Sequence, residues 1–236
     1  MRLRLPLRRW LLFAGLLAVA LLATLPLRLA ASWLGLDDIG LSARALGGSV
    51  WGGTITEAHL GPVPLGDLNA SLQPLPLLIG RARIDLGRKG DAAHGAISVT
   101  MRTTGIDDAT ARLPLGSVFA PVPIVALDLD DVSARLRDGL CEKAEGRVSA
   151  RIEGDIGGIA LPGGLTGNAR CDRGALLLPL VSQSGMERIA IRLLPEGRYR
   201  LDCIVRAADP ALRERLLGMG FAARGEALTM ALEGRL

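Results

Sequence analysis

The side chains best suited to chemistry are few in this chain of 236 residues. It contains two histidines, His59 and His94, and neither has a cysteine or another histidine at the spacing of a metal site. The residues around them favour a strand position for His59 and a turn position for His94. We therefore predict that the chain binds no metal and no cofactor.

Serine and carboxylate clusters do not form a catalytic motif either. The run Ser182-Gln183-Ser184-Gly185 lacks the Gly-x-Ser-x-Gly frame of a nucleophile elbow, and we interpret it as a polar turn between strands. The acidic run 128–131 has neither the spacing nor the glycine of a calcium loop. Glycine-rich residues 154–164 lack the Lys-Ser or Lys-Thr pair of a phosphate-binding loop. The prediction is a protein that is not an enzyme.

Three cysteines remain, Cys141, Cys171 and Cys203. Three thiols cannot all pair within one chain, so an oxidising compartment would give one disulfide and one remaining thiol. The compartment in which they lie depends on the N-terminal segment.

Residues 10–27 form a stretch of eighteen residues without a charge, which follows four arginines between residues 2 and 9 and precedes Arg28. A helix of that length spans about 27 Å, close to the hydrocarbon thickness of a bilayer. We predict a basic tail at 1–9, a transmembrane signal-anchor helix at 10–30 and a β domain at 31–236. A cleaved secretory signal, whose apolar region is usually shorter, is the alternative.

The distribution of charge sets the expected orientation. Basic residues before the anchor outnumber the single arginine after it, which favours a cytoplasmic N-terminus and a periplasmic C-terminal domain in the inner membrane. The net charge of +4 comes largely from the anchor region, because all 24 acidic residues fall at Asp37 or later. The exported part is therefore near neutral, and we predict no nucleic-acid partner.

Beyond the anchor, apolar and polar residues alternate in short runs that glycine and proline interrupt, a pattern typical of half-buried antiparallel strands. In 95–104, for example, Ile97, Val99 and Met101 share one face, and in 187–193 Ile189 and Ile191 do the same. The predicted fold is mostly β: an N-terminal transmembrane helix, then an antiparallel β roll or sandwich.

One short helix is expected in the C-terminal region of this β domain. Asp209 is a suitable N-cap, Pro210 suits the first turn, and Gly218 can end the helix.

Trp51 lies in the glycine-rich run Gly47-Gly48-Ser49-Val50-Trp51-Gly52-Gly53. Glycines on both sides allow close backbone approach and leave the indole as the main side chain of the segment. Two interpretations remain open for Trp51: a buried core anchor, or a contact with a partner or with the membrane surface.

Several segments, taken in order, resemble a known family. They are the basic tail and apolar stretch, Gly48-Ser49-Val50-Trp51-Gly52-Gly53, Gly167-Asn168-Ala169-Arg170-Cys171-Asp172-Arg173-Gly174, Leu178-Pro179-Leu180, and Asp209-Pro210-Ala211-Leu212 followed by Leu216-Leu217-Gly218-Met219-Gly220-Phe221. Their order and the size of the chain resemble protein N of the bacterial type II secretion system, over essentially the whole length.

The resemblance implies a bitopic inner-membrane protein of a Gram-negative bacterium that supports secretion of folded proteins from the periplasm across the outer membrane. It implies no catalytic activity and no cofactor. In the family pattern Cys141 and Cys171 match as the disulfide. The strand pattern leaves Cys171–Cys203 as an alternative, because both cysteines fall on apolar faces.

Two functional hypotheses follow. In the first, the β domain is a scaffold whose sheet edges or Trp51 region contact inner-membrane platform proteins, and possibly the secretin, of the secretion system. In the second, an open apolar groove binds or transports lipid. The two differ in whether Ile97, Val99, Ile189 and Ile191 are closed under another layer or line an open trough.

Overall fold

The computed structural model describes residues 7–29, 41–88, 90, 92–156, 158–160, 163–194 and 197–235. Its first half contains α1 (Leu7–Ala23), β1 (Leu41–Ser42), β2 (Ala45–Ser49), β3 (Gly52–Leu60), β4 (Val63–Leu72), α3 (Pro74–Leu77), β5 (Ala82–Arg88), β6 (His94–Val99) and β7 (Thr103–Pro114). Its second half contains β8 (Ile124–Arg137), β9 (Leu140–Ile152), β10 (Asp155–Ile156), β11 (Ile159–Ala160), β12 (Leu165–Asn168), β13 (Arg170–Asp172), β14 (Ala175–Ser182), β15 (Glu187–Leu193), β16 (Arg198–Arg206), α4 (Pro210–Gly218), β17 (Ala222–Arg224) and β18 (Ala227–Arg235).

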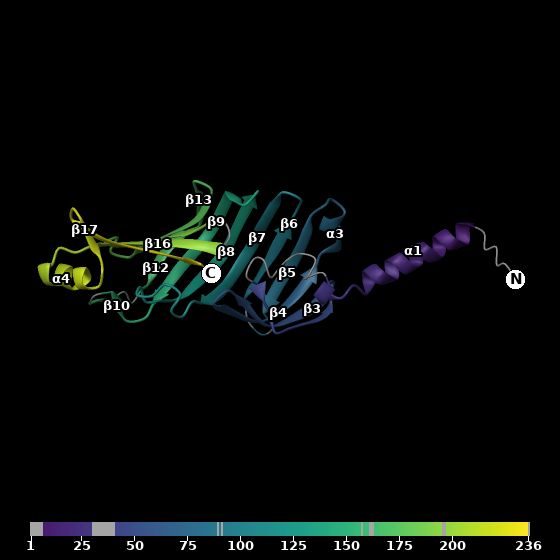
Figure 1. The fold of residues 1–236 in the computed structure, drawn as a ribbon, viewed down its shortest axis with the longest axis horizontal. Coiled ribbons are helices and arrows are strands. Elements are labelled where there is room, and N and C mark those ends of the chain that lie inside the picture. Colours follow the sequence, from purple (N-terminus) through teal and green to yellow (C-terminus); the bar gives the residue numbers. More distant parts are fainter. Residues whose placement is uncertain are drawn as a thin grey trace.

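Sixteen strands form one sheet, in the order β1-β3-β4-β5-β6-β7-β8-β9-β12-β14-β15-β16-β18-β17, with β2 added on β3 and β13 on β14. Neighbouring strands pair antiparallel throughout, from β3 with β4 to β16 with β18. The strands lie side by side along the long axis, with α1 at one end and α4 at the other (Figure 1). The prediction of a mostly β, antiparallel fold is confirmed, and the short helix α3 was not predicted.

The apolar N-terminal segment forms α1, which ends at Ala23 after 17 residues. Pro26 accounts for this end, because a residue that precedes proline is disfavoured in the α conformation. Among the helices that the structure describes, none has the length and hydropathy of a membrane span. Residue 30, where we expected the anchor to end, and residues 31–40, where we expected the β domain to begin, lie outside the described residues.

The second half of the sheet curls around one large apolar core. Inward side chains of successive strands lie in register, as in Leu178 beside Ile191 and Ile191 beside Leu201. Ile189 and Ile191 are each 1% exposed, so this part of the predicted trough is a closed core. The 115–122 loop, the β10–β11 hairpin and α4 contribute Phe119, Ile156 and Leu216 to it.

One contact joins strand β16 to the 115–122 loop, which is distant from it in the sequence. The Tyr199 hydroxyl on β16 donates to the carbonyl oxygen of Val118 at 2.8 Å, and its ring meets Phe119 edge to face at 5.0 Å between centroids. Val118 and Tyr199 are 81 residues apart, so this contact holds the loop against the curled second half of the sheet.

The first half has a smaller core built on Leu27, Ile55, Ala58 and Ala70. Its inward face is less completely covered than that of the second half. Ile97 and Val99 are only half-buried, and Ile106, which pairs with Ile97, is 46% exposed.

The expected face of strand β6 needs two corrections. The strand ends at Val99, so Met101 lies in the following turn and is fully exposed instead of sharing the inward face. Ser98, on the opposite face from Ile97 and Val99, is buried together with Ala96, and in the register of the sheet Ser98 lies beside Arg83 and Ala96 beside Asp85 and Asp107.

The helix that we expected in the C-terminal region is confirmed as α4. Asp209 accepts from the backbone amide of Ala211 at 3.0 Å and so acts as the N-cap. Leu216 is fully buried, whereas Leu217 is exposed.

Cys141 on β9 and Cys171 on β13 form a disulfide, with Cα atoms 5.5 Å apart. Cys203 on β16 is a free, buried thiol, so the alternative pairing of Cys171 with Cys203 is not the one present. Burial raises the pKa of Cys203 to about 12, and the nearby carboxylate of Glu187 acts in the same direction.

Gly167 offers a test of the packing between β12 and β14. A Cβ at this position would overlap the carbonyl oxygen of Pro179, so Gly167→Ala should lower the free energy of unfolding by about 2–3 kcal/mol or more. At Gly218, the last residue of α4, a Cβ meets nothing within 4 Å, and Gly218→Ala should stay within about 1 kcal/mol of the native chain. Urea unfolding in detergent measures both. Equal stability of the two variants would contradict this packing.

Cys203 offers a test of core closure by its reactivity. At pH 8 the native chain should resist maleimide, whereas the unfolded chain should take up one equivalent at its one free thiol. The unfolded thiol ionises near its ordinary pKa of 9.0 and the folded one only near 12, so stability from this group is present below pH 9 and is lost as the pH rises toward 12. The free energy of unfolding should therefore fall more steeply above pH 9 in the native chain than in Cys203→Ala. Rapid labelling of the native chain would mean an open core.

Candidate functional site

Trp51 marks the junction between α1 and the β domain. It is half-buried in the turn between β2 and β3, and its indole nitrogen donates to the carbonyl oxygen of Leu22 at 2.8 Å. Leu22 lies in the last turn of α1, where backbone carbonyls have no partner within the helix. The glycine-rich turn therefore presents its one large side chain to the end of the helix.

Backbone contacts strengthen the same junction. The amide of Val50 donates to the carbonyl oxygen of Leu25 at 2.9 Å, and Pro26 forms a bridge with Ser49. Leu27 is buried in the first core, and a Cβ on Gly53 would lie 2.7 Å from its Cδ2. The chain that leaves α1 is thus held by one side-chain bond, one backbone pairing and an apolar contact.

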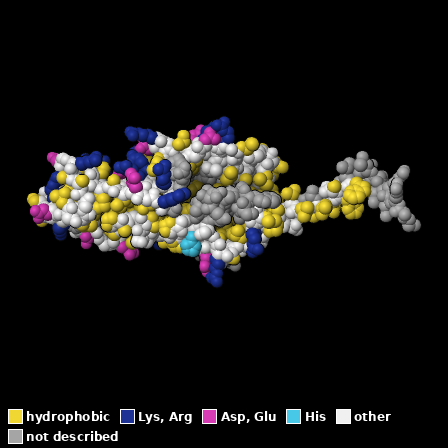
Figure 2. All heavy atoms as spheres, viewed as in Figure 1, with side chains coloured by type: hydrophobic (Ala, Val, Ile, Leu, Met, Phe, Trp, Pro, Cys, Tyr) yellow, Lys and Arg dark blue, Asp and Glu magenta, His cyan; other side chains and the backbone are white. Residues whose placement is uncertain are grey.

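The helix itself presents apolar side chains to its surroundings. Its described large side chains are between 58% and 72% exposed, namely Trp10, Leu12, Phe13, Leu16, Leu17, Val19, Leu21 and Leu22. Figure 2 shows these hydrophobic side chains along the helix that projects from the domain. A helix that is apolar on all sides requires an apolar environment.

A shallow groove of about 500 Å³ lies beside the junction, across β3, β4 and β5. Thr54, Asn69, Ser71 and Asp85 line it together with Gly52, Gly53 and Gly87. The edge strand β2 lies next to it, bonded to β3 along its length. On the side of β2 that faces away from β3, the backbone pairing within the described residues is the bridge between Pro26 and Ser49.

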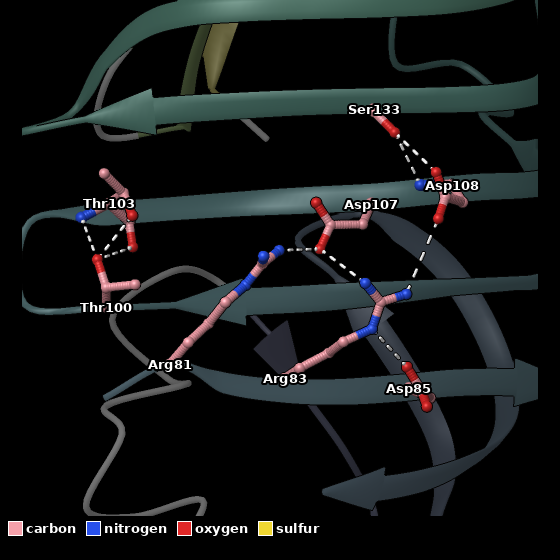
Figure 3. A network of polar contacts seen from close by, with 8 residues as sticks. All are labelled: Arg81, Arg83, Asp85, Thr100, Thr103, Asp107, Asp108 and Ser133. Carbon is pink, nitrogen blue, oxygen red and sulfur yellow. Dashed lines mark hydrogen bonds and ion pairs between the residues drawn. The ribbon is translucent and has the colours of Figure 1, made fainter. Parts of the chain in front are cut away.

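A network of charged side chains crosses three strands on the same sheet (Figure 3). The Asp107 carboxylate accepts from Arg81 at 2.7 Å and from Arg83 at 3.3 Å, and Arg83 also meets Asp85 at 3.1 Å. Because β6 lies between β5 and β7, the Arg83–Asp107 pair bridges two strands that are not neighbours. These charges neutralise one another, and their role in the structure is to fix β5 against β7.

The residues that we examined for catalysis do not come together. The Nδ1 atoms of His59 and His94 lie 2.9 and 2.7 Å from the carbonyl oxygens of Glu57 and Ala92, in the first half of the sheet. Ser182 lies elsewhere, on β14. In the described part of the chain no three potential ligands gather into a metal site.

The polar turn after β14 contains a buried carboxylate that the sequence did not reveal. Glu187 accepts hydrogen bonds from the hydroxyls of Ser182 and Ser184, the latter at 2.7 Å. It faces inward because it pairs with the buried Val205 across β15 and β16. A serine beside a carboxylate, with no histidine or lysine bonded to it among the described contacts, lacks an activating base. The only feature of the sequence that pointed to a buried carboxylate here was the pair of nearby serines, Ser182 and Ser184, which can donate to it.

Fold and junction together define a class of protein: a large antiparallel β sheet whose first strands contact the end of an apolar N-terminal helix. Residues 39–229 match the family model of the type II secretion system (T2SS), protein N, and the chain belongs to this family. Comparison with curated proteins and with solved structures gives no match. Family membership implies a role in type II secretion in the cell envelope, with other secretion components as partners, and is consistent with a structural protein without enzymatic activity.

The junction can be tested by removing the indole donor. Trp51→Phe keeps an aromatic ring but cannot donate to Leu22, so α1 should sample a wider range of angles. Spin labels on Leu12→Cys and on Thr54→Cys, in detergent micelles, should give a broader distance distribution in this variant. Trp10→Phe, which alters an exposed ring on α1, is the matched control and should leave the distribution unchanged. Identical distributions for all three chains would rule out an orienting role for Trp51.

Proposed function

We propose that this protein is a non-enzymatic inner-membrane component of the type II secretion system, which scaffolds protein–protein contacts during export of folded proteins across the outer membrane. The observation that carries the proposal is the junction: an apolar helix, exposed on all sides, is fastened to a β domain whose family belongs to this system. Family membership supports a role in the type II secretion system. The contacts at the junction support an anchor helix held against the β domain.

In this proposal α1, with adjoining residues, is the membrane anchor. The arginines between residues 2 and 9 favour a cytoplasmic N-terminus. The β domain then lies in the periplasm, where a disulfide such as Cys141–Cys171 persists. The anchor and the domain together make a single-pass protein.

The scaffold contacts are proposed at the end of the domain nearest α1. There the edge strand β2 offers backbone groups to which a partner strand can add. The adjacent groove offers the exposed side chains of Thr54 and Asn69. Trp51 contributes to this surface as a half-buried residue whose indole nitrogen is already bonded within the chain.

The second candidate function is lipid binding by an apolar β groove. A specific observation favours it in the first half of the roll, where Ile97 and Val99 are half-buried and Ile106 is exposed. The closed core around Ile189 and Ile191 argues against a groove that runs the length of the domain. Any lipid site is therefore confined to β5, β6 and β7.

Crosslinking in living cells distinguishes the two functions. A photo-crosslinking residue at Thr54, Asn69 or Ala45 should attach platform proteins or the secretin of the secretion system. The same residue at Glu214, exposed on α4 at the far end, is the control and should capture fewer of these proteins. Lipid adducts at Ile106, with no secretion component at Thr54, Asn69 or Ala45, would replace the scaffold function by lipid binding.

A further inference from the structure

The short turn between β4 and β5 exposes four large apolar side chains. Leu75, Leu77, Leu78 and Ile79 are 76%, 38%, 83% and 81% exposed. Residues 74–80, which we call the α3 tip, carry no charge. Elsewhere in the described β domain the exposed large hydrophobic residues stand singly, such as Met101 and Leu140, or as a pair, Leu217 and Met219. A cluster of exposed apolar side chains of this kind indicates a surface that binds a membrane or another protein.

The backbone of the α3 tip is unusually well suited to leaving water. Pro74 and Pro76 have no amide hydrogen, and four consecutive amides after them are bonded within the turn. The amides of Leu78, Ile79 and Gly80 donate to carbonyls three residues earlier at 3.2, 3.2 and 3.0 Å. The amide of Arg81 donates to Pro76 at 3.0 Å. Unsatisfied amides are the main cost of placing an irregular segment in lipid, and these four bonds and two prolines lower that cost.

Both ends of the α3 tip are fixed to the sheet. Before the tip, the Gln73 amide donates to the Arg83 carbonyl at 2.8 Å, and its side chain donates to Asp85. After it, Arg81 is paired with Asp107 on β7, as Figure 3 shows. The charged network therefore holds an apolar turn in a defined position at the rim of the sheet, although burial of that turn in the domain would serve folding better.

The position of the α3 tip matches that of the anchor. α3 lies at the end of the domain from which α1 projects, while α4 lies at the opposite end (Figure 1). A bilayer that takes up α1 must therefore meet this end of the domain first. The junction at Trp51 and Leu27 fixes the orientation in which it does so.

We propose that the α3 tip is a second membrane contact, which inserts Leu75, Leu78 and Ile79 into the interfacial region of the bilayer that α1 enters. This inference rests on the proposed anchoring of α1. Apolar side chains on a short segment can enter about 5–10 Å into the boundary between headgroups and acyl chains. Two points of contact, one helix and one turn, hold the roll at a fixed tilt, so that the groove and β2 face a constant direction.

The test uses the full chain in vesicles of phosphatidylethanolamine and phosphatidylglycerol, with an environment-sensitive fluorophore on one introduced cysteine. Leu78→Cys reports on the tip, Phe13→Cys on the anchor, and Leu217→Cys, exposed on α4, on the far end. The native free thiol is buried and stays unlabelled. Spin-labelled lipids should quench the fluorophore at residue 78 several-fold more than at residue 217. Adding Leu75→Asn and Ile79→Asn should reduce quenching at residue 78 and leave residue 13 unchanged.

The remaining outcomes separate the two proposals. Quenching at residue 13 with none at residue 78 would overturn the second contact and leave the anchor in place. Absence of quenching at both positions would overturn the anchor and the tip contact together. If residue 78 were shielded from aqueous iodide without being quenched by lipid, a second copy of the chain would cover the tip, and the membrane contact would be wrong.

Discussion

The structure depends on one constraint: an antiparallel sheet of sixteen strands has to hide its apolar face, and the other sheet in the described residues, β10–β11, has only two short strands. Half-buried strands leave one face for the core, and that face needs a cover. Curling supplies the cover in the second half, where the 115–122 loop reaches Tyr199 and α4 adds Leu216. The register of the strands then follows, because a shift by one residue would turn every inward side chain outward.

The first half satisfies the same constraint differently. Its core is smaller, and small residues replace large ones at several positions, such as Ala58 and Ala70. On the other face of β5, β6 and β7, arginines and aspartates form ion pairs, and the small buried residues Ala96 and Ser98 lie beside them in the register of the sheet. Because the first half buries less apolar surface, its stability depends more on the ion pairs between its strands. Ile106 and the α3 tip, which are exposed there, are the positions at which we have proposed contacts with lipid.

The sequence predicts the strands well because period-two alternation is a local property of each segment. It also predicts α4, since the Asp209 cap and Gly218 act within a few residues. It misassigns β6, because the surroundings of Ser98 are set by its neighbours on other strands, Arg83 on β5 and Gly105 on β7. Glu187 and the bond from Trp51 to Leu22 escape prediction for the same reason: each depends on strand pairing or on a contact 29 residues away. Long-range register, unlike local pattern, cannot be read from one sequence.

A domain fastened at several points along its length can hold a fixed orientation, and the fastenings here differ in chemistry. The α1 end is held by Trp51, Pro26 and Leu27, and the middle by the disulfide that ties β13 to β9. Crosslinking over a separation of 30 residues adds about 3–4 kcal/mol in the chain-entropy description. Because neither the bond from Trp51 nor the disulfide relies on the core, the junction can keep its geometry even where the first half buries little. That independence suits a component that must present the surface beside this junction in one direction to its partners.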